Sequence, residues 1–192
     1  SDLNACINGQ GFFATQAIST KEIDVDGDAA DVTDALKKAE FAYTRVGQFQ
    51  LDSQGYLTDG TNFIYGFRPD GNNGFKTGSL VALRVPSDLN NGFDDDALQA
   101  ASVKINELGE VTATVTNPDN GESVQVSLGK IAIVTFQNQE GLMKSGGTYY
   151  SASIGDNTGL CSATIPGGST SKLMTGYLEA SNVDLAKEFS EM

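Results

Sequence analysis

Short runs of alternating apolar and polar residues, separated by glycine-containing turns, constrain the fold of this chain more than any other feature. Between residues 41 and 67, Phe49 and Leu51 alternate with polar neighbours, and the same alternation returns over Phe63–Phe67. An apolar side chain at every second position is the pattern of a strand with one buried face. The segment therefore predicts several short strands rather than a helix.

Turn residues divide this segment into hairpins. The sequence Asp52-Ser53-Gln54-Gly55 has Asp at the first and Gly at the fourth position of a type I turn. Asp59-Gly60 gives a second turn signal a few residues later. We therefore expect a meander of two tight hairpins over residues 41–67.

A second meander is expected over residues 103–136, with turns at "NELG" and "NPDNG". One strand, Leu80–Val85, stands in the glycine-rich stretch between the meanders, and "DVTDALKKAE" (residues 31–40) favours a short helix with its N-cap near Asp31 or Thr33. The expected class is mainly β, as one discontinuous domain with halves 1–67 and 103–181 around a small loop-rich insertion, 68–102.

Charge and composition exclude several functions. The net charge is −13, from 25 acidic and 12 basic residues, so the field of the chain repels nucleic acid and anionic membrane surfaces. There is no histidine, which excludes Ser-His-Asp and Cys-His catalytic systems and His-ligated metals. We expect no catalytic, cofactor-binding or metal-binding residues, and two isolated buried thiols at Cys6 and Cys161.

Two acidic clusters are candidate sites. "DVDGDAADVTDA" (residues 24–35) places Asp at positions 1, 3 and 5 of an EF-hand-like loop, but Ala29 and Ala35 replace its glycine and its bidentate glutamate. A glycosidase would need two carboxyls at a defined separation, and the sequence does not give the separation of Asp94–Asp96 from Glu107 or Glu110. Both clusters are interpreted as solvated loops, with a weak adventitious cation site at residues 24–35 as the alternative.

The C-terminus has the pattern of a helix start over residues 182–192. Ser181 is a suitable N-cap, and Asp184 lies near the positive end of the helix dipole. The chain stops within an apolar stripe, so we expect further helical sequence beyond it, and the missing initiator Met indicates a start inside a longer protein. The residues of this candidate assembly seam are Val183, Leu185, Phe189 and Met192.

Four ordered blocks resemble the hook and rod proteins of the bacterial flagellum. They are "DLNACINGQGFFAT", "FAYTRVGQFQLDSQGYLTDG", "LGKIAIVTFQNQEGLMKSGGTYY" and "TGYLEASNVDLAKEFSEM", and they span nearly the whole chain. The signature of the second block consists of Tyr43, Thr44, Arg45, Gly47, Phe49, Asp52, Gly55 and Leu57. "SNVDLAKEF" is closer to the hook protein, whereas the short stretch 67–102 lacks the large outer domain of many hook proteins and keeps the distal rod protein as an alternative.

The resemblance implies a structural subunit rather than an enzyme. Such subunits are exported through the flagellar secretion channel without a cleaved signal and stack into a helical tube outside the cell. Their partners would be copies of the same chain and neighbouring rod, hook-cap and hook–filament junction proteins, with no nucleic acid, membrane or cofactor. In the hook, the tube acts as a universal joint that transmits torque. An extracellular β-sandwich adhesin remains the alternative of another class.

Overall fold

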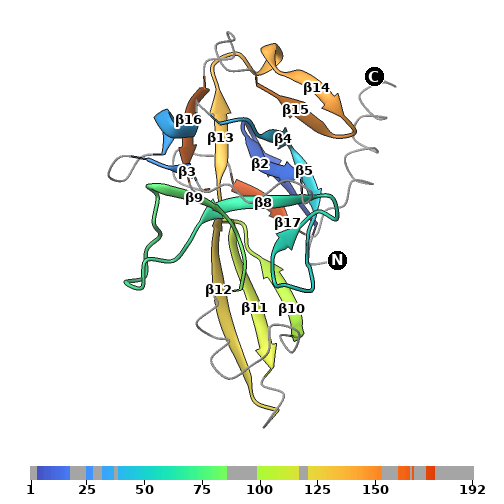
Figure 1. Cartoon of the computed structure of the whole chain (residues 1–192), viewed down its shortest axis with the longest axis vertical. Helices are drawn as coiled ribbons and strands as arrows, with labels where there is room; N and C mark the ends of the chain where they lie inside the picture. The colour runs from blue at the N-terminus through green and yellow to red at the C-terminus, as the bar shows by residue number, and fades with distance from the viewer. Residues whose placement is uncertain are drawn as a thin grey trace.

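The computed structural model describes residues 4–17, 25–27, 32–36, 39–85, 99–116, 121–152, 160–164, 166 and 172–175. Antiparallel strands dominate these residues, which confirms the mainly β class (Figure 1). The strands are β1 (Asn4–Asn8), β2 (Phe12–Ala17), β3 (Val25–Asp26), β4 (Ala42–Thr44), β5 (Val46–Gln48), β6 (Gln50–Leu51), β7 (Leu57–Thr58), β8 (Asn62–Phe67), β9 (Ser79–Ala82), β10 (Gln99–Ile105), β11 (Glu110–Thr116), β12 (Ser123–Ile131), β13 (Ile133–Phe136), β14 (Met143–Gly146), β15 (Tyr149–Ser151), β16 (Leu160–Thr164) and β17 (Lys172–Thr175). The helical elements are α1 (Thr33–Leu36) and the 3₁₀ turn η3 (Gln139–Gly141).

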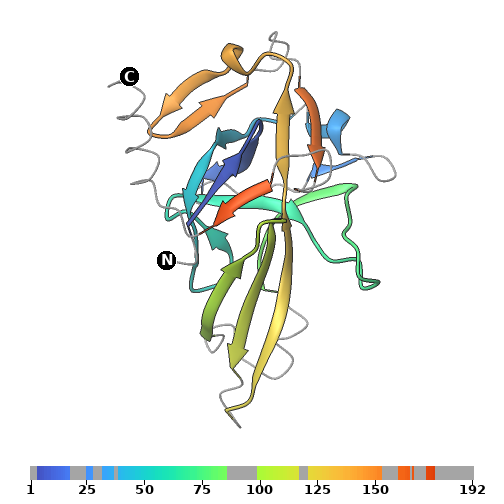
Figure 2. The same ribbon diagram turned by 180° about the vertical axis from the view of Figure 1, so that it is seen from behind.

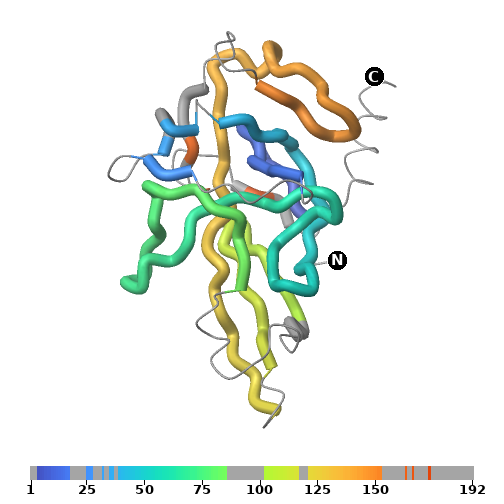
Figure 3. Tube along the Cα trace, viewed as in Figure 1, coloured from blue at the N-terminus to red at the C-terminus, as the bar shows by residue number. Residues whose placement is uncertain are grey.

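The larger sheet follows the order β10-β11-β12-β8-β2-β4-β15-β14, and shorter strands branch from this path. β8 crosses the middle of the molecule, between the lobe formed by β10, β11 and β12 and the remaining strands (Figures 1 and 3). β12 continues past Ala132 into β13, and so pairs first with β8 and then with β2. The second meander therefore connects both parts of the fold.

A smaller sheet of three strands, β17-β1-β5, brings the two ends of the described chain together. β1 pairs with β17 from Ala5 opposite Thr175 to Asn8 opposite Lys172, and Figure 2 shows the two strands from behind. The resemblance to hook and rod proteins implies that residues 2–13 lie near residues 178–184. The latter, like the expected C-terminal helix and its seam, lie outside the described residues.

The central strands are buried on both faces. In β8, Ile64 belongs to one apolar cluster, whereas Phe63, Tyr65 and Phe67 belong to a second cluster on the opposite face. β2 and β13 divide their side chains in the same way. Because successive side chains of a strand point to opposite faces, alternation in these strands separates two cores rather than core from solvent.

Three predicted elements differ in detail. Residues 7–14 predict a strand entered through a glycine-rich bend; the bend is present at Gly9–Gly11, with β2 after it, and the structure adds the strand β1 before it. The strand expected around Phe49 is divided, since β5 joins the smaller sheet and β6 pairs with β7. In the region of the predicted helix, α1 covers Thr33–Leu36. Among the described residues, no helix is long and apolar enough to cross a bilayer.

Candidate functional site

The acidic clusters form no evident site where the structure describes them. Within the described ranges, no three acidic or cysteine side chains converge as metal ligands. Asp26 accepts a hydrogen bond from Ser79 Oγ at 2.8 Å, and Glu110 accepts one from Ser127 Oγ at 3.0 Å. Asp24, Asp28 and Asp94–Asp96 lie outside the described residues.

Four signature residues of the second block, in contrast, lie at the junction of the two sheets: Tyr43, Thr44, Arg45 and Gly47. β1 pairs with β5 as far as Cys6 opposite Val46, and β2 pairs with β4 from Phe13 opposite Thr44. Between these two pairings, residues 7–12 of the β1–β2 segment lie opposite a single residue of the β4–β5 segment, Arg45. We call this arrangement the junction bulge.

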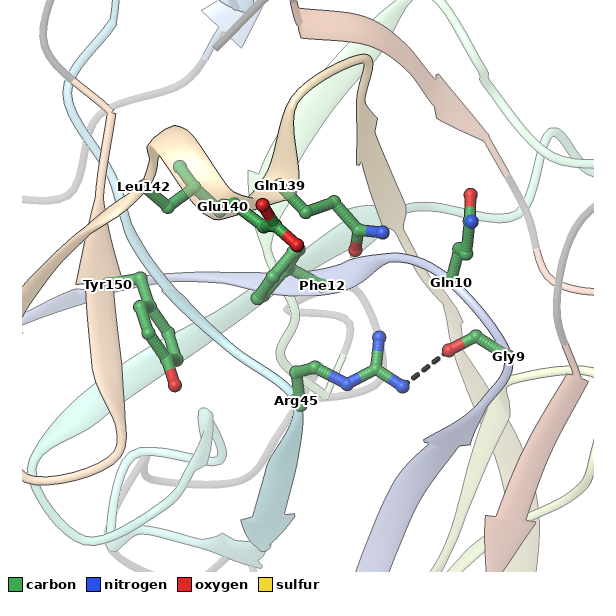
Figure 4. A pocket seen from close by; sticks show the side chains of 8 residues that line it. All are labelled: Gly9, Gln10, Phe12, Arg45, Gln139, Glu140, Leu142 and Tyr150. Carbon is green, nitrogen blue, oxygen red and sulfur yellow. Dashed lines mark hydrogen bonds between the residues drawn. The ribbon is translucent and has the colours of Figure 1, made fainter.

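The side chain of Arg45 fills the junction bulge (Figure 4). Its Nη1 donates to the carbonyl of Gly11 at 2.8 Å, and its Nη2 donates to the carbonyls of Ile7, at 3.2 Å, and Gly9. The guanidinium carbon also lies 5.7 Å from the centre of the Phe12 ring. A planar guanidinium with several fixed donors suits the three carbonyls that face it in the junction bulge.

Burial sets the electrostatics of this junction. Desolvation lowers the pKa of Arg45 from its ordinary value, while nearby Cys6 and Tyr150 raise it. Cys6 is a free, buried thiol, and burial raises its pKa, partly offset by the charge of Arg45. The expectation of an isolated buried thiol is thus confirmed for Cys6, whereas the side chain of Cys161 is not among those described.

An open hollow of about 490 Å³ lies beside the guanidinium. Gln139 from η3 reaches across it, and its Oε1 accepts a 3.5 Å hydrogen bond from the amide of Gly11. Figure 4 shows its lining: Gly9, Gln10, Phe12, Arg45, Gln139, Glu140, Leu142 and Tyr150. The hollow gives solvent a route to the junction, but its mixed lining defines no reaction.

Tyr43 and Thr44 hold the adjoining part of β4. The Tyr43 ring is 1% exposed and packs edge-to-face on Phe136, with 5.1 Å between ring centres, and burial raises the pKa of its hydroxyl. The buried Thr44 hydroxyl donates to the carbonyl of Val46 at 3.0 Å, across Arg45. Both residues therefore fix the strand that carries Arg45.

Gly47, Phe49 and Leu57 build the core behind the junction. Phe49 and Leu57 are fully buried, and the Phe49 ring packs edge-to-face on Phe13, with 5.4 Å between centres. A Cβ on Gly47 would overlap the Phe49 ring. Glycine at this position permits the close approach of strand and ring.

Asp52 and Gly55 form the predicted turn. Asp52 Oδ1 accepts from the amides of Gln54 and Tyr56, both at 2.9 Å, and Gly55 has a φ of +85°. Asn106 in the second meander makes the equivalent contacts, with its Oδ1 accepting from the amides at the second and fourth positions after it. All eight signature residues thus have a structural role in this fold.

Sequence reasoning missed the partners of these residues. Phe12 and Phe13 belong to the first block, and Phe136 and Tyr150 belong to the third, but the signature contains none of them. The cross-block ring contacts Phe12–Phe136, Phe12–Tyr150 and Phe13–Phe49 show that three of the resembling blocks form one unit. The aromatic residues of the first and third blocks were the sequence signal that could have indicated these partners.

Comparison with known proteins identifies flagellar relatives of the chain. The chain is 34% identical to flagellar basal-body rod protein FlgG of Bacillus subtilis (strain 168) over 93% of its length and 58% of the relative's. It is 27% identical to the protein of the same name from Buchnera aphidicola subsp. Schizaphis graminum, over 100% of the chain and 55% of the relative. Flagellar hook protein FlgE of Salmonella typhimurium is 35% identical over 62% of the chain and 23% of the relative. No family model matches the chain.

Fold and junction define a mainly β structural domain whose described ends meet in one small sheet. With its rod and hook relatives, the chain fits the hook/rod family of flagellar axial proteins, and the resemblance found in the sequence is confirmed. The chain spans a little over half the length of the rod proteins it matches.

Proposed function

We propose that this chain is part of a rod subunit of the flagellar basal body. The observation that carries this choice is the extent of the alignments: the rod relatives align over 93% and 100% of the chain, whereas the hook relative aligns over 62%. A subunit of the hook, which the terminal "SNVDLAKEF" favours, is the second candidate, supported by 35% identity over 120 residues.

The geometry of the small sheet suits either axial subunit. Asn4 at the start of β1 lies beside the end of β17, so both ends of the described chain leave the same place. Segments that continue from there can enter one inner layer of a tube, while the β domain stays outside. The three exposed large apolar residues among those described are Leu108, Val124 and Met143. A mostly polar outer surface favours weak contacts between neighbouring copies.

The proposed role is therefore structural. The chain contributes to a helical assembly of its own copies and of other axial proteins, outside the cell, after export through the flagellar secretion channel. A domain organisation with halves 1–67 and 103–181 around the insertion 68–102 belongs to this proposal, as does an assembly seam at Val183, Leu185, Phe189 and Met192. Catalysis is not part of this proposal.

Immunogold labelling of basal bodies isolated with their hooks, from the organism that encodes this chain, tests the proposal. Antibodies raised against the 192-residue chain should label the rod. Labelling confined to the hook would favour the second candidate. Labelling of neither, with the chain present in the same cells, would overturn the axial function. Antibodies against a known hook protein provide the positional control.

A further inference from the structure

Three links join the small sheet to the large one within the described residues: one leads from β5 to β6 through Phe49, and the other two meet at the junction bulge. β1 leads to β2 through Gly9–Gly11, and β4 leads to β5 through Arg45. Gly9 and Gly11 have φ values of +116° and +119°, in a region that L side chains rarely adopt. A glycine bend of this kind resists rotation weakly by itself, so the orientation of the small sheet must be fixed by something else.

Arg45 is placed to fix it. Its guanidinium binds the carbonyl of Ile7 in β1, before the bend. It also binds the carbonyls of Gly9 and Gly11 at the two ends of the bend, and Gly11 immediately precedes β2. The Arg45 carbonyl in turn accepts from the Ile7 amide at 3.2 Å. Charge-assisted hydrogen bonds to partly buried carbonyls are stronger than bonds between neutral groups. One side chain thus spans the bend.

We propose that Arg45 is a positioning residue that locks the small sheet onto the large sheet, so that displacement of β1 and β17 is transmitted to the body of the domain. Without the guanidinium, the Gly9–Gly11 bend would absorb such a displacement. In a rod or hook subunit, as proposed above, both chain ends continue from β1 and β17, and the lock would couple them to the outer domain. The lock itself does not depend on that function.

Cys6 offers a direct probe, since it lies in β1, 7% exposed, opposite Val46. In a Cys161→Ser background, Cys6 is the remaining thiol, and its reaction with N-ethylmaleimide reports opening of the small sheet. Arg45→Ala should accelerate this reaction at least about tenfold, because charge-assisted hydrogen bonds no longer oppose local opening. Electrostatics alone predicts the opposite, since loss of the Arg45 charge raises the pKa of the thiol and leaves less thiolate.

Chemical rescue separates a lock from general destabilisation. The hollow beside Arg45 is open, so N-ethylguanidinium at millimolar concentration can enter the space that Arg45→Ala leaves. It should restore slow Cys6 modification, whereas ethylammonium, which lacks the planar set of donors, should not. Arg45→Lys keeps the charge and should accelerate the reaction by an intermediate factor. If Arg45→Ala does not fold, the Cys6 rate of Arg45→Lys still tests the proposal.

Arg84 provides a matched control. It also binds a carbonyl, that of Gln54 at 3.2 Å, and its guanidinium carbon lies 4.7 Å from the centre of the Tyr56 ring. Arg84→Ala should leave the Cys6 rate unchanged. Amide hydrogen exchange in Arg45→Lys should quicken in β1, β5 and β17 but not in β10–β12.

An unchanged Cys6 rate in both Arg45 variants would overturn the proposal. So would equal acceleration of exchange in all strands, or rescue by ethylammonium as effective as rescue by N-ethylguanidinium. These outcomes concern the isolated chain, so they are independent of which flagellar part the antibodies label. If the Arg45 variants behave as expected but the antibodies label neither rod nor hook, the proposed function is refuted and the lock is not.

Discussion

At the scale of single residues, close packing around the junction explains part of the signature, whereas Asp52 and Gly55 belong to a turn. Gly47 shows this packing most directly, because a side chain there would overlap the buried ring of Phe49. Gly47→Ala should lower the free energy of unfolding by about 1–3 kcal/mol, the usual range for overpacking a core. Urea denaturation followed by circular dichroism measures this loss.

A double-mutant cycle identifies its cause. Phe49→Leu shortens the side chain that the methyl group added by Gly47→Ala would meet, so the double variant should lose less stability than the sum of the two single losses. Additive losses would show that the backbone at Gly47, rather than the ring, is the origin of the effect.

Tyr43 gives a pH-dependent prediction. Burial raises the pKa of its hydroxyl in the folded chain, so its contribution is fully present below the unfolded-state pKa of about 10 and is lost as pH rises above that value. Wild-type stability should therefore fall relative to Tyr43→Phe between about pH 9 and 11, by at most about 1.4 kcal/mol per pH unit. Urea midpoints at several pH values measure the difference, and parallel pH profiles would contradict it.

At the scale of elements, the two meanders use one turn in two places. Asp52 and Asn106 both accept hydrogen bonds from the amides two and four residues later, and Gly55 and Gly109 both have positive φ. Asp52→Asn and Asn106→Asp should each change stability by less than about 0.5 kcal/mol, because either side chain supplies the same acceptor. The alanine variants should each lose about 1 kcal/mol.

Chemical denaturation of the four variants tests this equivalence. A loss in Asn106→Asp as large as in Asn106→Ala would show that the amide nitrogen of Asn106, rather than its oxygen, supports the turn. At the other turn, the stability loss of Asp52→Asn is compared in the same way with that of Asp52→Ala.

The same elements show how far sequence predicts this fold. Turns and alternation predicted both meanders, because each depends on residues close together in the chain. The glycines at positions 9 and 11 predicted the bend there, but neither its contact with Arg45 nor the division at Phe49 could be predicted, since both depend on residues more than thirty positions away. The signature was found by resemblance, but its physical role required the partners Phe13 and Phe136 from other blocks.

At the scale of the whole molecule, charge governs association. With a net charge of −13, copies of the chain repel each other at low salt. The candidate seam at Leu185, Phe189 and Met192 covers barely two turns, and helices shorter than about a dozen residues are marginal in water. The 192-residue chain should sediment as a monomer at micromolar concentration, whereas long polymers would show that the β domain carries assembly.

The two cores should unfold together, because the same strands build both. Phe13 in β2 and Ile64 in β8 belong to one core, while their neighbours Phe12 and Phe63 belong to the other. Loss of either core removes the packing that holds these strands, so calorimetry should show one transition with equal calorimetric and van't Hoff enthalpies. Ile64→Ala and Val134→Ala, one in each core, should both move that single transition to lower temperature. Two transitions, each shifted by one variant alone, would instead show that the two cores are separate cooperative units.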